Sequence, residues 1–95
     1  MAAVEVSQAA AARLEQLIAT HGLPPDAKER VRRSLRVIEL FPYAGRELEG
    51  EWQGFRFISG PWRWLLIVYV YDESAEVAHV VTVQDARSSQ ALIRD

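Results

Sequence analysis

Two arginines on either side of a tight turn are the side chains in this sequence that could most readily form a binding site. Arg56 precedes and Arg63 follows the dipeptide Gly60-Pro61, and the residues before the turn alternate as they do in a β-strand. If the flanking runs pair as antiparallel strands, the two guanidinium groups come close together in space. A cationic pair of this kind can hold a phosphate or a carboxylate, and the sequence does not choose between these anions.

Composition indicates one small domain without a metal or a cofactor. The 95 residues are 49% hydrophobic, which is enough for one core, so we expect a single domain over residues 1–95. Cysteine is absent, which excludes disulfides and thiolate metal sites. His21 and His79 are far apart in the sequence, and the glycine-rich signatures that cradle phosphates are missing. We therefore expect neither a metal site nor a bound cofactor.

The sequence lacks the segments that would direct it to a membrane. Its first six residues, MAAVEV, have neither the basic start nor the continuous apolar core of a signal peptide. The longest apolar run, from Trp64 to Tyr71, is too short to cross a bilayer. We expect a cytoplasmic protein with no membrane partner.

Charge is distributed unevenly along the chain. A formal net charge of −2 and a pI of about 5.7 argue against nucleic acid as the main partner, and no direct sequence-specific nucleic-acid binding is expected. Residues 28–36 nevertheless hold five cations against Glu29 alone, a local charge of +4 that leaves −6 on the rest of the chain. A solvated helix face with ion pairs is the usual explanation of such a run, and a partner surface is the alternative.

Helical spacing dominates the first half of the chain. After a short strand at residues 3–6, Ser7 is placed to cap a helix over residues 8–20, which Gly22 would end. Asp26 and Glu29 have the spacing of a capping box for a second helix, and Pro42 ends that helix near residue 40 or 41. The two helices are expected to form a hairpin.

The apolar period changes to two after Pro42. Strands are expected over residues 54–58, 62–71 and 77–83, and the middle one is apolar on both faces, as a central strand is. The tail is compatible with a last short helix. The order β-α-α-β-β-β predicts a two-layer α+β domain in which the helical hairpin packs on a largely antiparallel, twisted sheet.

Alternation along the strands also assigns their faces. The side expected to meet the helices carries Phe55, Phe57, Trp64, Leu66 and Val68. The opposite side carries Arg56, Arg63, Leu65, Ile67 and Tyr69. A monomer rarely leaves such an apolar patch open to water, so we expect a partner to bind Leu65, Ile67, Tyr69 and Arg63.

The order of these elements, the loop Pro42-x-x-Gly45-x-x-Leu48-x-Gly50 and the hairpin from Phe55 to Arg63 resemble the RelE/ParE superfamily of bacterial toxins. The resemblance covers nearly the whole chain, and it rests on the motifs in this order and spacing. It implies the toxin of a type II toxin-antitoxin module, in which a cognate antitoxin wraps over the toxin in a hetero-oligomer.

One branch of that superfamily, the RelE-like toxins, cuts messenger RNA on the ribosome. By resemblance, Arg63 matches an arginine after the hairpin turn, Arg56 stands where a lysine is usual, and Arg87 loosely matches an arginine after the last strand. Gly54 occupies a second lysine position, and Leu92 lies where a tyrosine is often found. Arginine is a poor proton-transfer group, so His79 is the candidate for a substitute base, although its strand neighbours also fit an ordinary structural histidine.

The other branch, the ParE-like toxins, poisons DNA gyrase through protein contacts and needs no catalytic residue in the toxin. The acidic pI, the single lysine, Gly54 and the missing tyrosine favour this branch. The sequence leaves enzyme activity open, and a non-toxic interaction module of the same fold remains the third hypothesis. Arg63 also has a plain structural alternative, an ion pair with Glu49 or Glu51.

Overall fold

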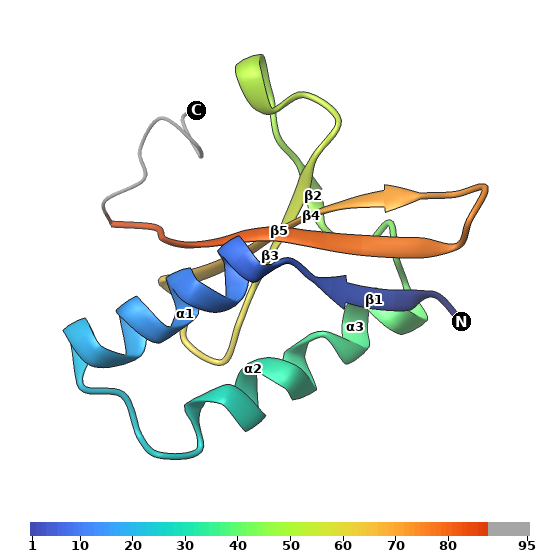
Figure 1. The fold of residues 1–95 in the computed structure, drawn as a ribbon. Helices are drawn as coiled ribbons and strands as arrows, with labels where there is room; N and C mark the ends of the chain where they lie inside the picture. Colours follow the sequence, from blue (N-terminus) through green and yellow to red (C-terminus); the bar gives the residue numbers. More distant parts are fainter. Residues whose placement is uncertain (88–95) are drawn as a thin grey trace.

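Five strands within residues 1–87, the range that the structure describes, form one twisted sheet with helices on one face in this computed structural model (Figure 1). The strand order is β1-β5-β4-β3-β2, and β1 alone of these five runs parallel to its neighbour. The strands are β1 Ala3–Val6, β2 Arg46–Glu47, β3 Arg56–Ser59, β4 Leu65–Asp72 and β5 Val77–Asp85. The predicted α+β class and the central position of the strand in residues 62–71 are confirmed, since β4 is the middle strand.

The first helix begins and ends as its sequence predicts. α1 spans Gln8–His21, and the Ser7 hydroxyl accepts a hydrogen bond from the backbone N–H of Ala10 at 3.0 Å. The same hydroxyl donates to the Val81 carbonyl at 3.2 Å, so this cap also ties α1 to β5. Gly22 ends the helix in the left-handed region at φ +58°, where glycine is favoured.

The second predicted helix is divided into α2, Ala27–Ser34, and α3, Arg36–Leu40, at Leu35. The predicted capping box is wrong, because the Asp26 side chain makes no cap hydrogen bond. Its carboxylate instead accepts from Arg30 Nε at 3.0 Å, and Glu29 pairs with Arg32 at 3.0 Å. Ion pairs between residues three and four apart thus take the side chains that the capping box needed. The predicted last short helix lies outside the described residues.

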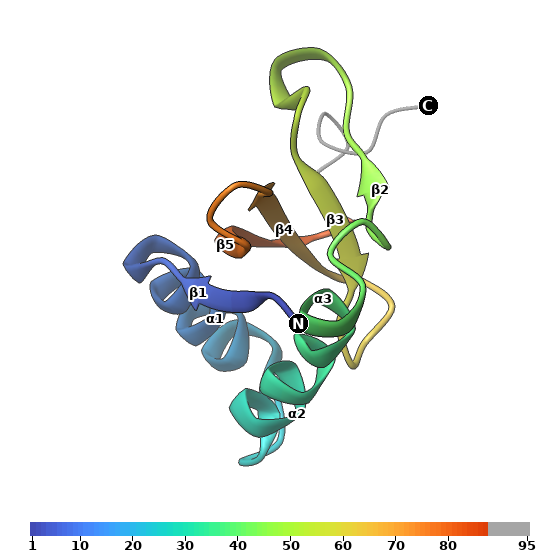
Figure 2. The ribbon, with the colours of Figure 1, turned by 90° about the vertical axis from the view of Figure 1, so that its right-hand side faces the viewer.

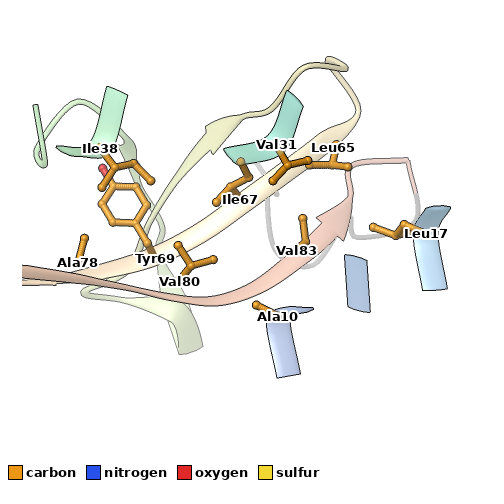
Figure 3. Packing of buried hydrophobic residues seen from close by; sticks show 10 residues of the cluster. All are labelled: Ala10, Leu17, Val31, Ile38, Leu65, Ile67, Tyr69, Ala78, Val80 and Val83. Carbon is orange, nitrogen blue, oxygen red and sulfur yellow. The ribbon is translucent and has the colours of Figure 1, made fainter. Parts of the chain in front are cut away.

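The core lies between the helices and one face of the sheet. Figure 3 shows Ile38 of the helical segment over Tyr69, and Val31 near Leu65 and Ile67. The predicted assignment of the two sheet faces is therefore wrong. Leu65, Ile67 and Tyr69 are at most 1% exposed and pack under the helices, so their side chains are not the open partner surface that the alternation suggested.

The opposite face carries a second, smaller apolar cluster. Leu66 and Val68 pack there with Leu48 of the segment after β2, and Trp52, Phe55 and Phe57 surround them. This segment includes a 3-10 turn, η1 at Gly50–Trp52, and it extends away from the helices (Figure 2). Because β4 is apolar on both faces, alternation did not indicate which face the helices cover. Trp64, which was expected to share a face with Leu66 and Val68, packs instead against the cluster under the helices.

A β-bulge in β5 changes the alternation of that strand. Val68 pairs with Thr82 and Tyr69 with Val80, which leaves Val81 as the extra residue. Val80 and Val83 consequently both belong to the core under the helices, although one has an even and the other an odd position. Past the bulge, Asp85 pairs with Leu65 at the end of the sheet.

Candidate functional site

Arg56 is held by the loop that precedes its own strand. Its Nη1 donates to the carbonyl oxygens of Gly45 at 2.9 Å and Tyr43 at 3.2 Å, and its Nη2 lies 3.3 Å from a carboxylate oxygen of Glu47. The guanidinium carbon also lies 5.2 Å from the centre of the Tyr43 ring. Its side chain is only 22% exposed. These contacts hold the Arg56 guanidinium against the loop.

The structure does not bring Arg56 and Arg63 together. Arg56 pairs with Tyr69, whereas the ordered pairing of the hairpin ends three positions later, at Ser59 and Leu66. At about 3.3 Å per residue, that is roughly 10 Å along the strand before the turn that contains Arg63 even begins. The predicted cationic pair across the turn is therefore wrong, because the two arginines lie at opposite ends of the hairpin.

Arg63 is exposed in the connection between β3 and β4. Backbone hydrogen bonds close this connection, from Gly60 N–H to the Leu65 carbonyl at 2.8 Å and from Leu65 N–H to the Trp62 carbonyl at 3.0 Å. Within residues 1–87, the Arg63 side chain has no ion pair, so the predicted alternative of a pair with Glu49 or Glu51 is not formed. Among the residues that the structure describes, no carboxylate neutralises the charge of Arg63.

Arg87 belongs to a cluster of side chains at the end of β5. Asp85 accepts hydrogen bonds from the backbone N–H of Arg87 at 2.9 Å and from its guanidinium at 3.1 Å. His21, the last residue of α1, places Nε2 3.2 Å from the same carboxylate. The Arg87 guanidinium carbon lies 4.9 Å from the Trp64 ring centre, and the His21 ring lies 4.4 Å from that ring.

Asp85 and Arg87 stabilise each other's charged form. Hydrogen bonds from the Arg87 side chain lower the pKa of Asp85, although burial opposes that shift, and the carboxylate raises the pKa of Arg87 in return. Asp85 is only 7% exposed, and its satisfied carboxylate orients Arg87 and His21. Sequence reasoning missed the roles of Asp85 and His21, because residues 64 positions apart give no spacing signal.

His79 lies away from these arginines. Its Nδ1 is 3.3 Å from a carboxylate oxygen of Glu5 on the neighbouring strand β1, and it pairs with Val70 of β4. Asp85 follows it by six residues along β5, so His79 stands near the opposite end of the strand from Arg87. The histidine that does lie with Arg87 is His21.

An apolar groove runs between α1 and α2. It has a volume of about 260 Å³, and Ala10, Leu14, Val31 and Leu35 contribute to its lining. An ion pair between Glu15 and Lys28 bridges the two helices at its rim. Large apolar side chains are also exposed on α3 and just after it, namely Val37, Leu40, Phe41 and Tyr43.

Within residues 1–87, no three side chains of the metal-binding types lie close enough together to hold an ion. None of the helices in that range has the length and apolar character needed to span a membrane.

Comparison with known proteins finds similarity at the level of structure. No protein-family model and no curated protein sequence matches the chain. A chain of the RelBE2 toxin-antitoxin complex from Mycobacterium tuberculosis matches with a TM-score of 0.68 and 19% identity, over 88% of this chain and 96% of that one. A chain of the chromosomal ParDE toxin-antitoxin system from P. aeruginosa matches with a TM-score of 0.69 and 11% identity, over 90% and 96%.

A chain of the intact RelBE toxin-antitoxin complex from E. coli matches with a TM-score of 0.61 and 16% identity, over 90% of this chain and 98% of that one. Identities this low establish a shared fold alone. Since RelE-type and ParE-type structures match similarly well, the fold does not favour either branch.

Proposed function

We propose that this chain, which has the RelE/ParE toxin fold, is the toxin of a bacterial type II toxin-antitoxin module. The observation that carries the proposal is the match over nearly the full length of chains from three toxin-antitoxin systems. The loop from Pro42 to Gly50 and the hairpin that ends in Arg63 add support, because both carry the motifs of that superfamily. The toxin would act in the cytoplasm, where its candidate targets are.

A cognate antitoxin is the proposed partner, and the groove between α1 and α2 is the surface we assign to it. The groove is lined mainly by apolar side chains and bordered by charged ones, which suits the apolar face of an amphipathic helix. Val37, Leu40 and Phe41 would extend that contact, since each is 45% exposed or more. The earlier candidates Leu65, Ile67 and Tyr69 are covered by the protein's own helices.

DNA gyrase is the proposed target. Cleavage of RNA needs several cations around one phosphate, together with a group that takes the proton of the ribose hydroxyl. Arg56 is committed to the loop carbonyls, and it is separated from Arg63 by the length of the hairpin. Gly54 also stands where a RelE-like toxin would have a lysine. A protein-directed poison needs none of these groups, so the dispersed arginines fit it better.

Ribosome-dependent cleavage of messenger RNA is the second candidate, and one observation favours it. The Asp85 carboxylate lies 3.2 Å from Nε2 of His21, and an Arg87 nitrogen lies 3.4 Å from Nδ1 of the same ring. A histidine oriented by a carboxylate beside an arginine is an arrangement that general-base catalysis uses. In this candidate His21 takes the role that the sequence analysis gave to His79. A non-toxic interaction module is the third.

Controlled expression of the chain in bacteria tests the toxin proposal. Growth should stop when the chain is expressed alone and continue when the antitoxin is co-expressed. Normal growth with verified soluble protein would overturn the proposal and favour the interaction module.

Two assays on purified protein then separate the targets. A gyrase poison inhibits DNA supercoiling and leaves ribosome-bound messenger RNA intact, which is the expected result. Cleavage of that messenger RNA, lost in His21→Gln but kept in His79→Gln, would instead establish the second candidate. Arg46→Gln is a suitable control in both assays, because Arg46 is an exposed arginine at the far edge of the sheet.

A further inference from the structure

The outer side of α3 carries a stripe of exposed apolar side chains. Val37 and Leu40 are each 45% exposed, and Phe41 is 65% exposed. The backbone N–H of Phe41 donates to the Val37 carbonyl at 2.8 Å, so Phe41 lies one helical turn after Val37, and Leu40 lies beside it on the same side. Ile38 is fully buried and points the other way, into the core. We call the three exposed side chains the α3 patch.

Further apolar side chains adjoin the α3 patch. Met1 is exposed beside it, because the backbone N–H of Ala2 donates to the Glu39 carbonyl at 2.9 Å, and Figure 2 shows the N-terminus next to α3. Tyr43 follows two residues after the patch and is also exposed. Among the large apolar side chains exposed in residues 1–87, only Val6, at the other end of β1, lies apart from this group. Such a concentration of exposed apolar surface is typical of an interaction site.

Two opposite charges border the α3 patch, and neither is paired. Arg36 is exposed and Glu39 is partly exposed, three positions later on the same helix. In the part of the chain that the structure describes, no ion pair includes either side chain. The same spacing on α2 does give an ion pair, between Glu29 and Arg32 at 3.0 Å. The patch therefore offers a partner one cation and one carboxylate, without an excess of either sign.

This surface is complementary to itself. A two-fold axis through the middle of α3, at right angles to the helix, places the helix of a second copy antiparallel to the first. Val37 of each copy then faces Leu40 of the other. Arg36 of each copy likewise meets Glu39 of the other, so both charges are paired twice. A two-fold interface needs such a surface, because the same residues serve both partners. A strongly acidic or strongly basic partner would match only one of the two charges.

We propose that two copies of this chain associate through the α3 patch, with their α3 helices antiparallel about a two-fold axis. Phe41, the most exposed member of the patch, is the aromatic anchor of the contact. Because the patch is small, the dimer should be weak, with a Kd of about 10–100 µM. The inference does not rest on the proposed function. The antitoxin contact proposed above extends over the same side chains, so an antitoxin and a second copy would compete for them.

Sedimentation equilibrium of the purified full chain, without any partner, tests the proposal. Over a concentration range of about 5–500 µM, which brackets the expected Kd, the average mass should rise from the monomer value of 10.8 kDa toward twice that value. It should not rise further, because a two-fold interface closes on itself. A chain that stays monomeric over the whole range would overturn the proposal and leave the α3 patch to the antitoxin, and assemblies larger than the dimer would also contradict it.

Two matched apolar-to-polar variants locate the interface. Phe41→Ser should raise the dimer Kd about tenfold or more, because it removes the aromatic anchor. Val6→Ser removes an exposed apolar side chain away from the patch and should leave the Kd unchanged. Val6 also lines the groove between α1 and α2. A Kd that rises in Val6→Ser and not in Phe41→Ser would therefore place the interface at that groove and contradict the proposal.

Exchange of the bordering charges supplies a second readout that a folding defect cannot imitate. Arg36→Glu gives each copy two carboxylates beside the patch, and Glu39→Arg gives each copy two cations. Either variant alone should dimerise about threefold to tenfold more weakly than the wild type, because like charges then face each other across the interface. An equimolar mixture of the two variants should restore dimerisation, since each cation again meets a carboxylate. A mixture that associates no better than the separate variants would overturn the antiparallel pairing.

Discussion

The hydroxyl of Tyr69 and the backbone nitrogen of Gly45 are 3.0 Å apart, and this contact joins the central strand to the loop after α3. The same hydroxyl donates to the Pro42 carbonyl at 2.7 Å. Tyr69 therefore satisfies two backbone groups of the loop with one buried side chain. The loop in turn supplies the carbonyl oxygens that hold Arg56, so the strand, the loop and the arginine form one connected unit.

Removal of the Tyr69 hydroxyl should destabilise the protein by about 1–3 kcal/mol, because the Gly45 N–H and the Pro42 carbonyl would lose their partner. Tyr69→Phe keeps the ring and its packing, so the loss would come from the hydrogen bonds. Urea unfolding measures the change. An unaltered free energy of unfolding would mean that water satisfies both groups in the variant.

Addition of one methyl group at Gly45 should destabilise the fold about as much. A Cβ atom there would lie 2.6 Å from the Tyr69 hydroxyl oxygen and 2.9 Å from the Phe57 carbonyl oxygen, closer than such atoms approach. The strand and the loop would have to separate, at a cost of roughly 1–3 kcal/mol. Gly22→Ala is an informative comparison, because nothing lies within 4 Å of a Cβ at that position and only its φ of +58° opposes the change.

Substitution of Arg56 and of Arg63 should have clearly different effects on the stability of the protein. Arg56→Gln should lower the free energy of unfolding by about 1–2 kcal/mol, because two loop carbonyl oxygens lose their donor. Arg63→Gln should change it by less than about 0.5 kcal/mol, since the side chain is exposed. Thermal unfolding of the two variants beside wild type provides the measurement, and equal shifts would contradict the structural role of Arg56.

These contrasts show what the sequence could and could not predict. Strands β1, β3, β4 and β5, the helical hairpin, the Ser7 cap and the Gly22 stop follow from local rules, and the structure confirms them. The two-residue strand β2 was not predicted, because it lies in a polar, glycine-containing stretch that was expected to be a loop. The side of the sheet that the helices cover did not follow, because β4 is apolar on both faces and the bulge at Val81 shifts the alternation of its neighbour. When both faces of a strand are equally apolar, tertiary packing decides which face the helices cover.

The positions of the candidate site residues also depended on tertiary structure that the sequence did not reveal. The pairing of Arg56 with Arg63 assumed that strand residues just before a turn lie close to it, whereas the register places Arg56 opposite Tyr69. The cluster of His21 and Asp85 joins the end of the first helix to the end of the last strand. The contact between His21 and Asp85 forms only when the chain folds, so no local sequence pattern predicts it.

The acid stability of the protein should report on the Asp85 cluster. The Arg87 side chain holds the pKa of Asp85 below its ordinary value, so the folded state releases this proton more readily than the unfolded chain does. The resulting stabilisation is present above the unfolded-state pKa of about 3.9 and is lost as the pH falls through the lower folded-state value. The difference between wild type and an Asp85 variant should therefore shrink in acid.

Asp85→Asn tests this expectation, because the amide keeps the size of the side chain but removes the charge that Arg87 and His21 face. At pH 7 the variant should unfold at a lower urea concentration than wild type, and the two midpoints should converge as the pH falls from about 5 to below 3. Asp26→Asn is the control, since that carboxylate is 51% exposed in its ion pair with Arg30 and should contribute little. Wild-type and Asp85→Asn curves that stay parallel at every pH would show that the carboxylate acts through packing rather than through its charge.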